Sequence, residues 1–112
     1  MDLHSTKTND TLIITVNEAR IDASAAIRFK DSMRALTDAG PPHAVLDLSK
    51  VSFVDSSGLG AIVASKKQLR PGQRLDLAGL TPDVAKVFRL TRMDTVFVIH
   101  DSPDSVSGRA VG

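Results

Sequence analysis

The sequence contains no cysteine, no tryptophan and no tyrosine, and only four phenylalanines. Without cysteine there is no disulfide framework, no thiolate nucleophile and no cysteine-based metal site. The shortage of aromatic residues weighs against single-strand nucleic acid binding, which relies on side chains that stack on bases. Fourteen Lys and Arg are offset by thirteen Asp and Glu, so no basic face is expected for a phosphate backbone. We therefore predict no direct nucleic acid partner.

Long hydrophobic runs are also missing. No window approaches the roughly 18 consecutive apolar residues that a membrane span requires. The first ten residues, MDLHSTKTND, lack the charged start and apolar run of a secretory signal. We therefore predict a cytoplasmic protein without membrane insertion. The chain has 112 residues, of which 42% are hydrophobic, and this suits one domain spanning residues 1–112.

Five segments are predicted to be strands. Residues 1–8 and 11–16 read as two strands joined by a tight Asn9-Asp10 turn, because Thr, Ile and Val dominate the second run. The apolar run at 44–48 is typical of a central strand covered by helices on its faces. Alternation at 74–77 predicts a fourth strand, and a β-rich run at 95–99 predicts the last.

Three segments between these strands carry apolar residues at helical spacing. The first helix is expected to start at Asp22 as its N-cap and to stop at Gly40, in the left-handed cap conformation, before two prolines. The second covers about 59–69, and the third starts at Thr81 with a proline in its first turn. A final helix at about 102–110 is left open.

This alternation predicts an α/β fold, with a mixed sheet of about five strands and three to four helices. Its parallel strands would be linked by right-handed helical crossovers. Residues 51–60, VSFVDSSGLG, follow the central strand and precede the second helix. Strand-to-helix turns of this kind lie at the carboxyl edge of the sheet, where open α/β proteins place functional loops.

The string Asp-Ser-Ser-Gly in this turn has two interpretations. The start of a helix leaves N–H groups unpaired and favours negative charge, so a phosphate on a serine here would be stabilised. Alternatively, Asp55, Ser56 and Ser57 simply cap the helix, and Gly58 and Gly60 let the turn be tight. The turn lacks the Gly-Lys-Ser/Thr of a P-loop and the Gly-x-Ser-x-Gly of a nucleophile elbow. No catalytic residue is therefore predicted, and the protein is not expected to be an enzyme.

The apolar strand at 45–48, followed by Asp-Ser-Ser-Gly-Leu-Gly at 55–60 and a helix, resembles the signature of anti-sigma-factor antagonists of the STAS family. The resemblance covers nearly the whole chain in element order and includes residues 20–23 and 88–91. It implies that Ser56 is phosphorylated by a partner that is both an anti-sigma factor and a serine kinase of the histidine-kinase-like ATPase class. It also implies a serine phosphatase that restores the active form. Ser57 is the neighbouring alternative.

The resemblance further implies how the protein works. The unphosphorylated chain would bind the anti-sigma factor and free a sigma factor, and phosphorylation would end that binding, so that transcription is regulated by partner switching. The implied partner-binding residues are Asp22, Asp55, Ser57, Gly58 and Leu59. Two alternatives remain: an interaction module of another partner-switching system, and a STAS docking subunit of a lipid or anion transporter.

The remaining titratable residues predict no metal site and no cofactor. His4, His43 and His100 are far apart in sequence, without paired-ligand spacing or an adjacent carboxylate motif, so each is expected to be a surface or turn histidine. Asp47 is expected to point outward from its strand as a solvated carboxylate.

Overall fold

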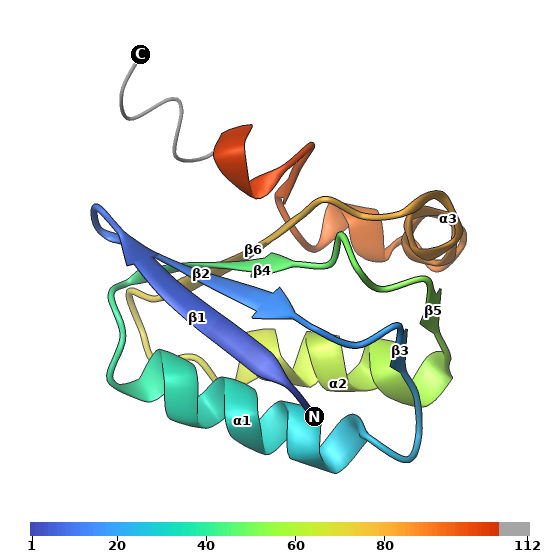
Figure 1. Cartoon of the computed structure of the whole chain (residues 1–112), viewed down its shortest axis with the longest axis horizontal. Coiled ribbons are helices and arrows are strands. Elements are labelled where there is room, and N and C mark those ends of the chain that lie inside the picture. The colour runs from blue at the N-terminus through green and yellow to red at the C-terminus, as the bar shows by residue number, and fades with distance from the viewer. Residues whose placement is uncertain (106–112) are drawn as a thin grey trace.

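The computed structural model describes residues 1–105, and its central feature is a five-stranded mixed sheet in the order β1-β2-β4-β6-β7 (Figure 1). Only β1 and β2 are antiparallel, and every other neighbouring pair in this sheet is parallel. The prediction of an α/β fold with a mixed sheet of about five strands is confirmed. The strands of the sheet are β1 (Leu3–Thr8), β2 (Thr11–Val16), β4 (His43–Asp47), β6 (Arg74–Ala78) and β7 (Ile99–His100).

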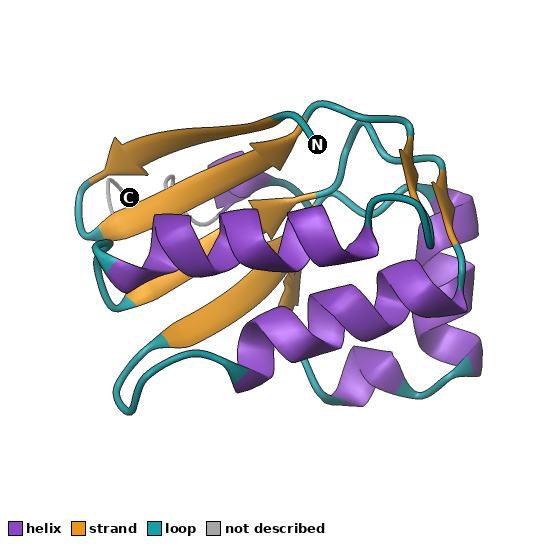
Figure 2. Cartoon of the chain, turned by 90° about the horizontal axis from the view of Figure 1, so that it is seen from below, coloured by secondary structure: helices purple, strands orange, loops and turns teal. Residues whose placement is uncertain are grey.

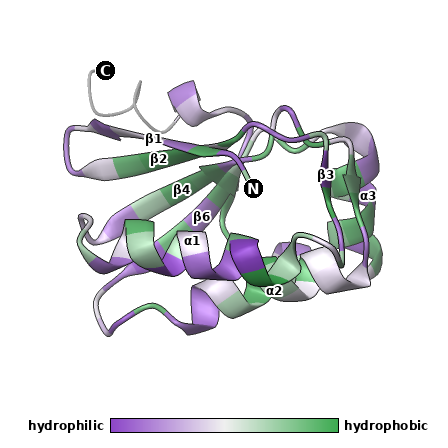
Figure 3. Cartoon of the chain, turned by 60° about the horizontal axis from the view of Figure 1, so that its bottom comes forward, coloured by the Kyte–Doolittle hydropathy of each residue, from purple (hydrophilic) through white to green (hydrophobic). Residues whose placement is uncertain are grey.

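Helices α1 (Ala26–Asp38) and α2 (Ser56–Lys67) lie side by side under one face of this sheet (Figure 2). The apolar core fills the space between them and the strands, and the hydrophobic colouring of β2, β4 and α2 follows it (Figure 3). Within residues 1–105, no helix is long and apolar enough to cross a membrane. The largest fully buried core side chains include Ile14, Phe29, Met33, Leu46, Ile62, Leu75, Leu77 and Phe88.

A second, two-stranded sheet stands apart from the first. It pairs β3 (Arg20–Ile21) with β5 (Phe53–Val54) in parallel, and α3 (Pro82–Leu90) packs against β5 (Figures 1 and 3). Pattern reasoning missed both strands, because two residues are too few to establish an alternation. This small sheet brings the segment before α1 next to the segment before α2.

The start of α1 differs from the prediction. Asp22 is not the N-cap: Ala25 holds that position, without a side-chain cap, and the helix begins at Ala26. The backbone N–H of Ala25 instead donates to the Asp22 carbonyl at 3.0 Å, closing a turn ahead of the helix. Asp22 therefore belongs to the loop that connects β3 to α1.

The end of α1 was located correctly but for a different reason. The helix ends at Asp38, followed by Ala39 with a φ of −102°, and Gly40 is not among the glycines with a positive φ. A Cβ on Gly40 would lie 3.0 Å from the Leu36 carbonyl oxygen and 3.2 Å from the Leu12 side chain. Close packing, and not a left-handed conformation, accounts for glycine at this position.

The last predicted strand is much shorter than expected. Residues 93–95 form a 3-10 helix, η1 (Met93–Thr95), and only Ile99 and His100 pair with β6. Phe97 is buried and contacts Phe88 edge to face, with ring centroids 6.1 Å apart, so its apolar character serves loop packing. Of the final helix considered at 102–110, residue 102 is not helical, residues 103–105 are helical, and residues 106–110 lie outside the described residues.

The backbone of β3 packs directly on the first turn of α2. A Cβ added to Gly58 would lie 1.9 Å from the Ile21 carbonyl oxygen, a distance that real side chains do not show. Gly60, on the next turn, has nothing within 4 Å of such an added atom. The close approach therefore requires glycine at 58 and not at 60.

This contrast predicts opposite effects for two matched substitutions. Gly58→Ala is expected to lower the free energy of unfolding by about 2 kcal/mol or more, because the added methyl group overpacks against backbone. Gly60→Ala is expected to raise it by about 0.5–1 kcal/mol, because alanine is the better helix former. Urea denaturation followed by circular dichroism measures both. Equal effects of the two changes would show that β3 does not pack on α2 as described.

Candidate functional site

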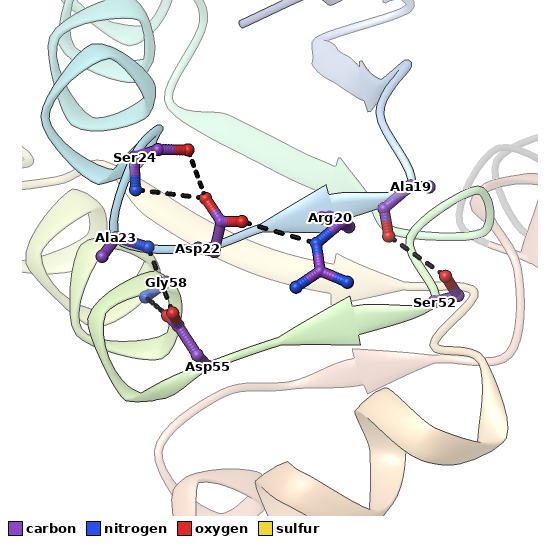
Figure 4. Close-up of polar contacts among 8 residues, drawn as sticks. All are labelled: Ala19, Arg20, Asp22, Ala23, Ser24, Ser52, Asp55 and Gly58. Carbon is purple, nitrogen blue, oxygen red and sulfur yellow. Dashed lines mark hydrogen bonds and ion pairs between the residues drawn. The ribbon is translucent and has the colours of Figure 1, made fainter.

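The carboxylate of Asp55 organises the start of α2. Asp55 is the N-cap residue, and one of its oxygens accepts a hydrogen bond from the Gly58 N–H at 2.8 Å. The other oxygen accepts from the Ala23 N–H at 3.1 Å, across 32 residues of sequence (Figure 4). One side chain thus satisfies an unpaired N–H of the helix and also fastens the loop that precedes α1.

Ser56 and Ser57 are the first two residues of α2, and both are exposed. Within residues 1–105, neither hydroxyl has a hydrogen-bond partner. The cap is made by Asp55 alone, so the two serines are not used for capping. Both hydroxyls lie in the first turn of a 12-residue helix, whose partial positive charge favours an added anion.

The two serines face different surface hollows. Ser56 lines one between α2 and the loop after α3, together with Leu59, Lys67 and Met93. Ser57 lines another between α1 and α2, beside Ile27, which is 71% exposed. A modification at 56 would therefore change a different surface from one at 57.

Asp22 is partly exposed and lies in a polar cluster on the loop between β3 and α1. Its carboxylate accepts hydrogen bonds from the Ser24 hydroxyl at 2.6 Å, from the Ser24 N–H at 3.1 Å and from Arg20 Nε at 3.4 Å (Figure 4). The Ser24 hydroxyl is the largest cause holding the pKa of Asp22 below its ordinary value; partial desolvation opposes it, and Arg20 assists. Asp22 is therefore a fixed negative charge at neutral pH.

Arg20 and Phe53 extend this surface along the small sheet. The Arg20 guanidinium carbon lies 4.2 Å from the centre of the Phe53 ring, and both side chains are exposed. The carbonyl of the preceding residue, Ala19, accepts a hydrogen bond from the Ser52 hydroxyl at 3.2 Å (Figure 4). The edge formed by β3, β5 and the start of α2 is thus polar and charged at its rim.

The structure brings together the residues implied as a partner surface, but they differ in accessibility. Ser57 is exposed, while Asp22 and Leu59 are partly exposed. Asp55 has both oxygens engaged, and Gly58 is buried under the backbone of β3. Any contribution of Asp55 and Gly58 to binding would come from the shape that they hold.

The prediction for Asp47 is wrong. The residue is only 8% exposed, and its carboxylate accepts from the Ser49 N–H at 3.0 Å and the Thr15 hydroxyl at 3.5 Å. Alternation correctly placed Asp47 on the face of β4 opposite the helical core. That face is also buried at this position. The alternation of residues along one strand cannot show whether its second face is covered.

The prediction that every histidine lies at the surface or in a turn is wrong for two of the three. His4 is exposed, but His43 and His100 are half-buried strand residues whose Nε2 atoms lie 2.8 and 3.0 Å from one oxygen of Asp76. Residues 43, 76 and 100 meet because β4, β6 and β7 are neighbours in the sheet. A signal existed in the sequence, since each residue lies in a predicted strand or directly beside one, but the strand order was needed to use it.

The site and fold have clear relatives. The model of the STAS domain matches residues 3–106, and the chain belongs to this family. The anti-sigma-B factor antagonist of Listeria monocytogenes is 31% identical over 89 residues, which are 79% of this chain and 78% of that protein.

Two solved structures show the same fold. An anti-sigma factor antagonist from Mycobacterium paratuberculosis superposes with a TM-score of 0.83 at 23% identity, covering 93% of this chain and 88% of that one. The Bacillus cell fate determinant SpoIIAA in its phosphorylated form superposes with a TM-score of 0.69 at 18% identity, covering 97% and 99%.

The hydrogen bonds of Asp22 predict a measurable titration effect. Removing the hydroxyl with Ser24→Ala is expected to move the pKa of Asp22 upward toward its ordinary value, because the carboxylate loses the donor that most favours its ionised form. Ser32→Ala, a serine on α1 with no contact to Asp22, is the control and should leave that pKa unchanged. NMR titration of the Asp22 carboxyl carbon measures both. An unchanged pKa in Ser24→Ala would refute the assigned hydrogen bond.

Proposed function

We propose that this protein is an anti-sigma factor antagonist that binds an anti-sigma factor when Ser56 is unmodified and loses affinity when Ser56 is phosphorylated. The names of its relatives support the general role. The observation that carries the specific proposal is the exposed Ser56 hydroxyl, which has no partner within residues 1–105 and lies in the first turn of α2. A kinase would reach it without unfolding any element.

Ser56 is favoured over Ser57 by its surroundings. Both are accessible, but Ser56 follows the fixed carboxylate of Asp55 directly and lines the hollow shared by α2 and the region after α3. Ser57 faces the groove between α1 and α2. The family resemblance implies phosphorylation on the first serine after the aspartate, which is Ser56.

Charge provides the switching mechanism. A phosphoryl group adds about −1.5 to −2 charge and three acceptor oxygens next to Asp55. In the free protein the helix start favours that charge by about 0.3–1 kcal/mol. In a complex, a surface that fits a neutral hydroxyl would have to desolvate a dianion beside a carboxylate that is already held in place. A hundredfold loss of affinity needs only about 2.7 kcal/mol, so no change of fold is required.

The proposed partners follow from this role. A kinase-type anti-sigma factor of the histidine-kinase-like ATPase class would supply the nucleotide and the catalytic base, and this chain would be its substrate. A serine phosphatase would reverse the modification. Asp22, Ser57 and Leu59 lie on or beside the edge that carries Ser56 and are proposed as binding residues, whereas Asp55 and Gly58 hold that edge together. All of these steps are proposed to take place in the cytoplasm.

The first test maps the phosphate. Incubation with the cognate kinase and ATP is expected to add one phosphoryl group at Ser56, as located by mass spectrometry. Ser56→Ala should abolish incorporation, and Ser57→Ala, the matched control one residue away, should still be modified. Modification at another residue, or none, would refute the assignment of Ser56.

The second test measures partner binding directly. Ser56→Ala is expected to bind the anti-sigma factor with an affinity close to that of the unmodified protein, because it introduces no charge. Ser56→Asp should weaken binding by about tenfold or more, corresponding to roughly 1.4 kcal/mol, while Ser57→Asp should have a smaller effect. Calorimetry with the purified partner provides the affinities. Equal binding of Ser56→Ala and Ser56→Asp would rule out a charge switch.

A further inference from the structure

Three strands bring two histidines and an aspartate together on the face of the main sheet that points away from α1 and α2. Neighbouring positions Ala44 and Leu75 belong to the helical core, so His43 and Asp76 point to the opposite face by strand alternation. His100, in β7, pairs with Ala78 of β6 and shares that face. One ring nitrogen of each histidine and one Asp76 carboxylate oxygen all lie within 4.8 Å of one another.

The Asp76 carboxylate is buried and incompletely satisfied. Its side chain is 1% exposed, and its Oδ2 atom accepts from His43 at 2.8 Å, His100 at 3.0 Å and Arg74 at 3.1 Å. Its Oδ1 atom is buried and has no hydrogen-bond partner among the described residues. Burial would raise the pKa of Asp76, but hydrogen bonds from His100 and His43 and the charge of Arg74 outweigh it, so the group is ionised. A buried carboxylate oxygen without a partner is rare in native structures and calls for an explanation.

We propose that His43, Asp76 and His100 form a binding site for a divalent first-row transition metal such as Zn²⁺. Two imidazole nitrogens and one carboxylate are a donor set that such ions take, with a further position open to water. Tetrahedral ligands about 2.0–2.1 Å from zinc are about 3.3 Å apart. The observed 2.8 and 3.0 Å separations need to widen only slightly to admit the ion.

The charges around the cluster are compatible with metal binding. Metal binding needs the lone pair of each Nε2, so the proton that each ring now directs at Asp76 has to move to Nδ1 or leave to solvent. The Arg74 guanidinium lies 3.1 Å from the same carboxylate oxygen and 3.2 Å from His43 Nε2, but its side chain is 58% exposed and can turn outward. The metal would bring two positive charges to a carboxylate that now has one beside it and one oxygen without a partner among the described residues.

A bound ion would join β4, β6 and β7 across the sheet. β7 is an edge strand whose pairing with β6 covers only two residues, so a ligand on His100 would hold it in place. The site lies on residues that take no part in the surface around Ser56, and its occupancy can be tested without the partner protein.

The test is titration of the tag-free full chain with ZnCl2, followed by calorimetry and by the shift in Tm. One equivalent is expected to bind and to raise Tm. His43→Ala and His100→Ala should each weaken binding more than about tenfold, whereas His4→Ala, an exposed histidine on β1, should not change it. Arg74→Gln should strengthen binding, because the guanidinium no longer competes for Asp76.

A spectroscopic measurement on the unsubstituted protein covers the case in which a histidine variant fails to fold. With ZnCl2, the ring NMR signals of His43 and His100 should shift together at one equivalent while those of His4 stay in place. With CoCl2, visible absorption should appear at the same stoichiometry and be displaced by zinc. Absence of zinc binding, or binding that depends on His4, would show that the cluster is only a buried ion pair network.

Discussion

The two hydrogen bonds accepted by Asp55 hold the candidate site in shape. One fixes the first turn of α2 through Gly58, and the other fixes the loop before α1 through Ala23. The contact works only because Gly58 has no side chain, which lets the Ile21 carbonyl lie against the helix. The small β3–β5 sheet can therefore pack against the start of α2, and this packing sets the position of Ser56 relative to Asp22.

The residues that hold this surface in shape differ from the residue that is proposed to carry the phosphate. Asp55 and Gly58 make contacts inside the protein, whereas the Ser56 hydroxyl has no hydrogen-bond partner among the described residues. Under the proposed function, a charge placed on this hydroxyl would weaken the binding of a partner there and would leave the packing of the core unchanged. The histidine–aspartate cluster lies on the other face of the main sheet, on different strands, so an ion there would act on the edge of the sheet and not on Ser56.

Most of the fold could be predicted from local pattern. The strands around Leu46 and Leu75 and the helix with Pro82 at its start were each specified by period and capping chemistry. The failures share one cause, which is that tertiary packing decided the outcome. Phe97 looked like part of a strand but fills a gap beside Phe88, and Asp47 looked solvated but lies on a second buried face. The His43 cluster depends on strand order, which no single segment contains.

Under the proposed function, phosphate on Ser56 changes a surface and leaves the fold intact. Comparison of backbone amide shifts and hydrogen exchange in unmodified and Ser56-phosphorylated protein tests it most directly. We expect changes confined to the first turn of α2 and the adjoining residues of β3 and β5, with protection in β2, β4 and β6 unaltered. Loss of protection across those three strands would contradict the account, because the modification would then act by disrupting the core.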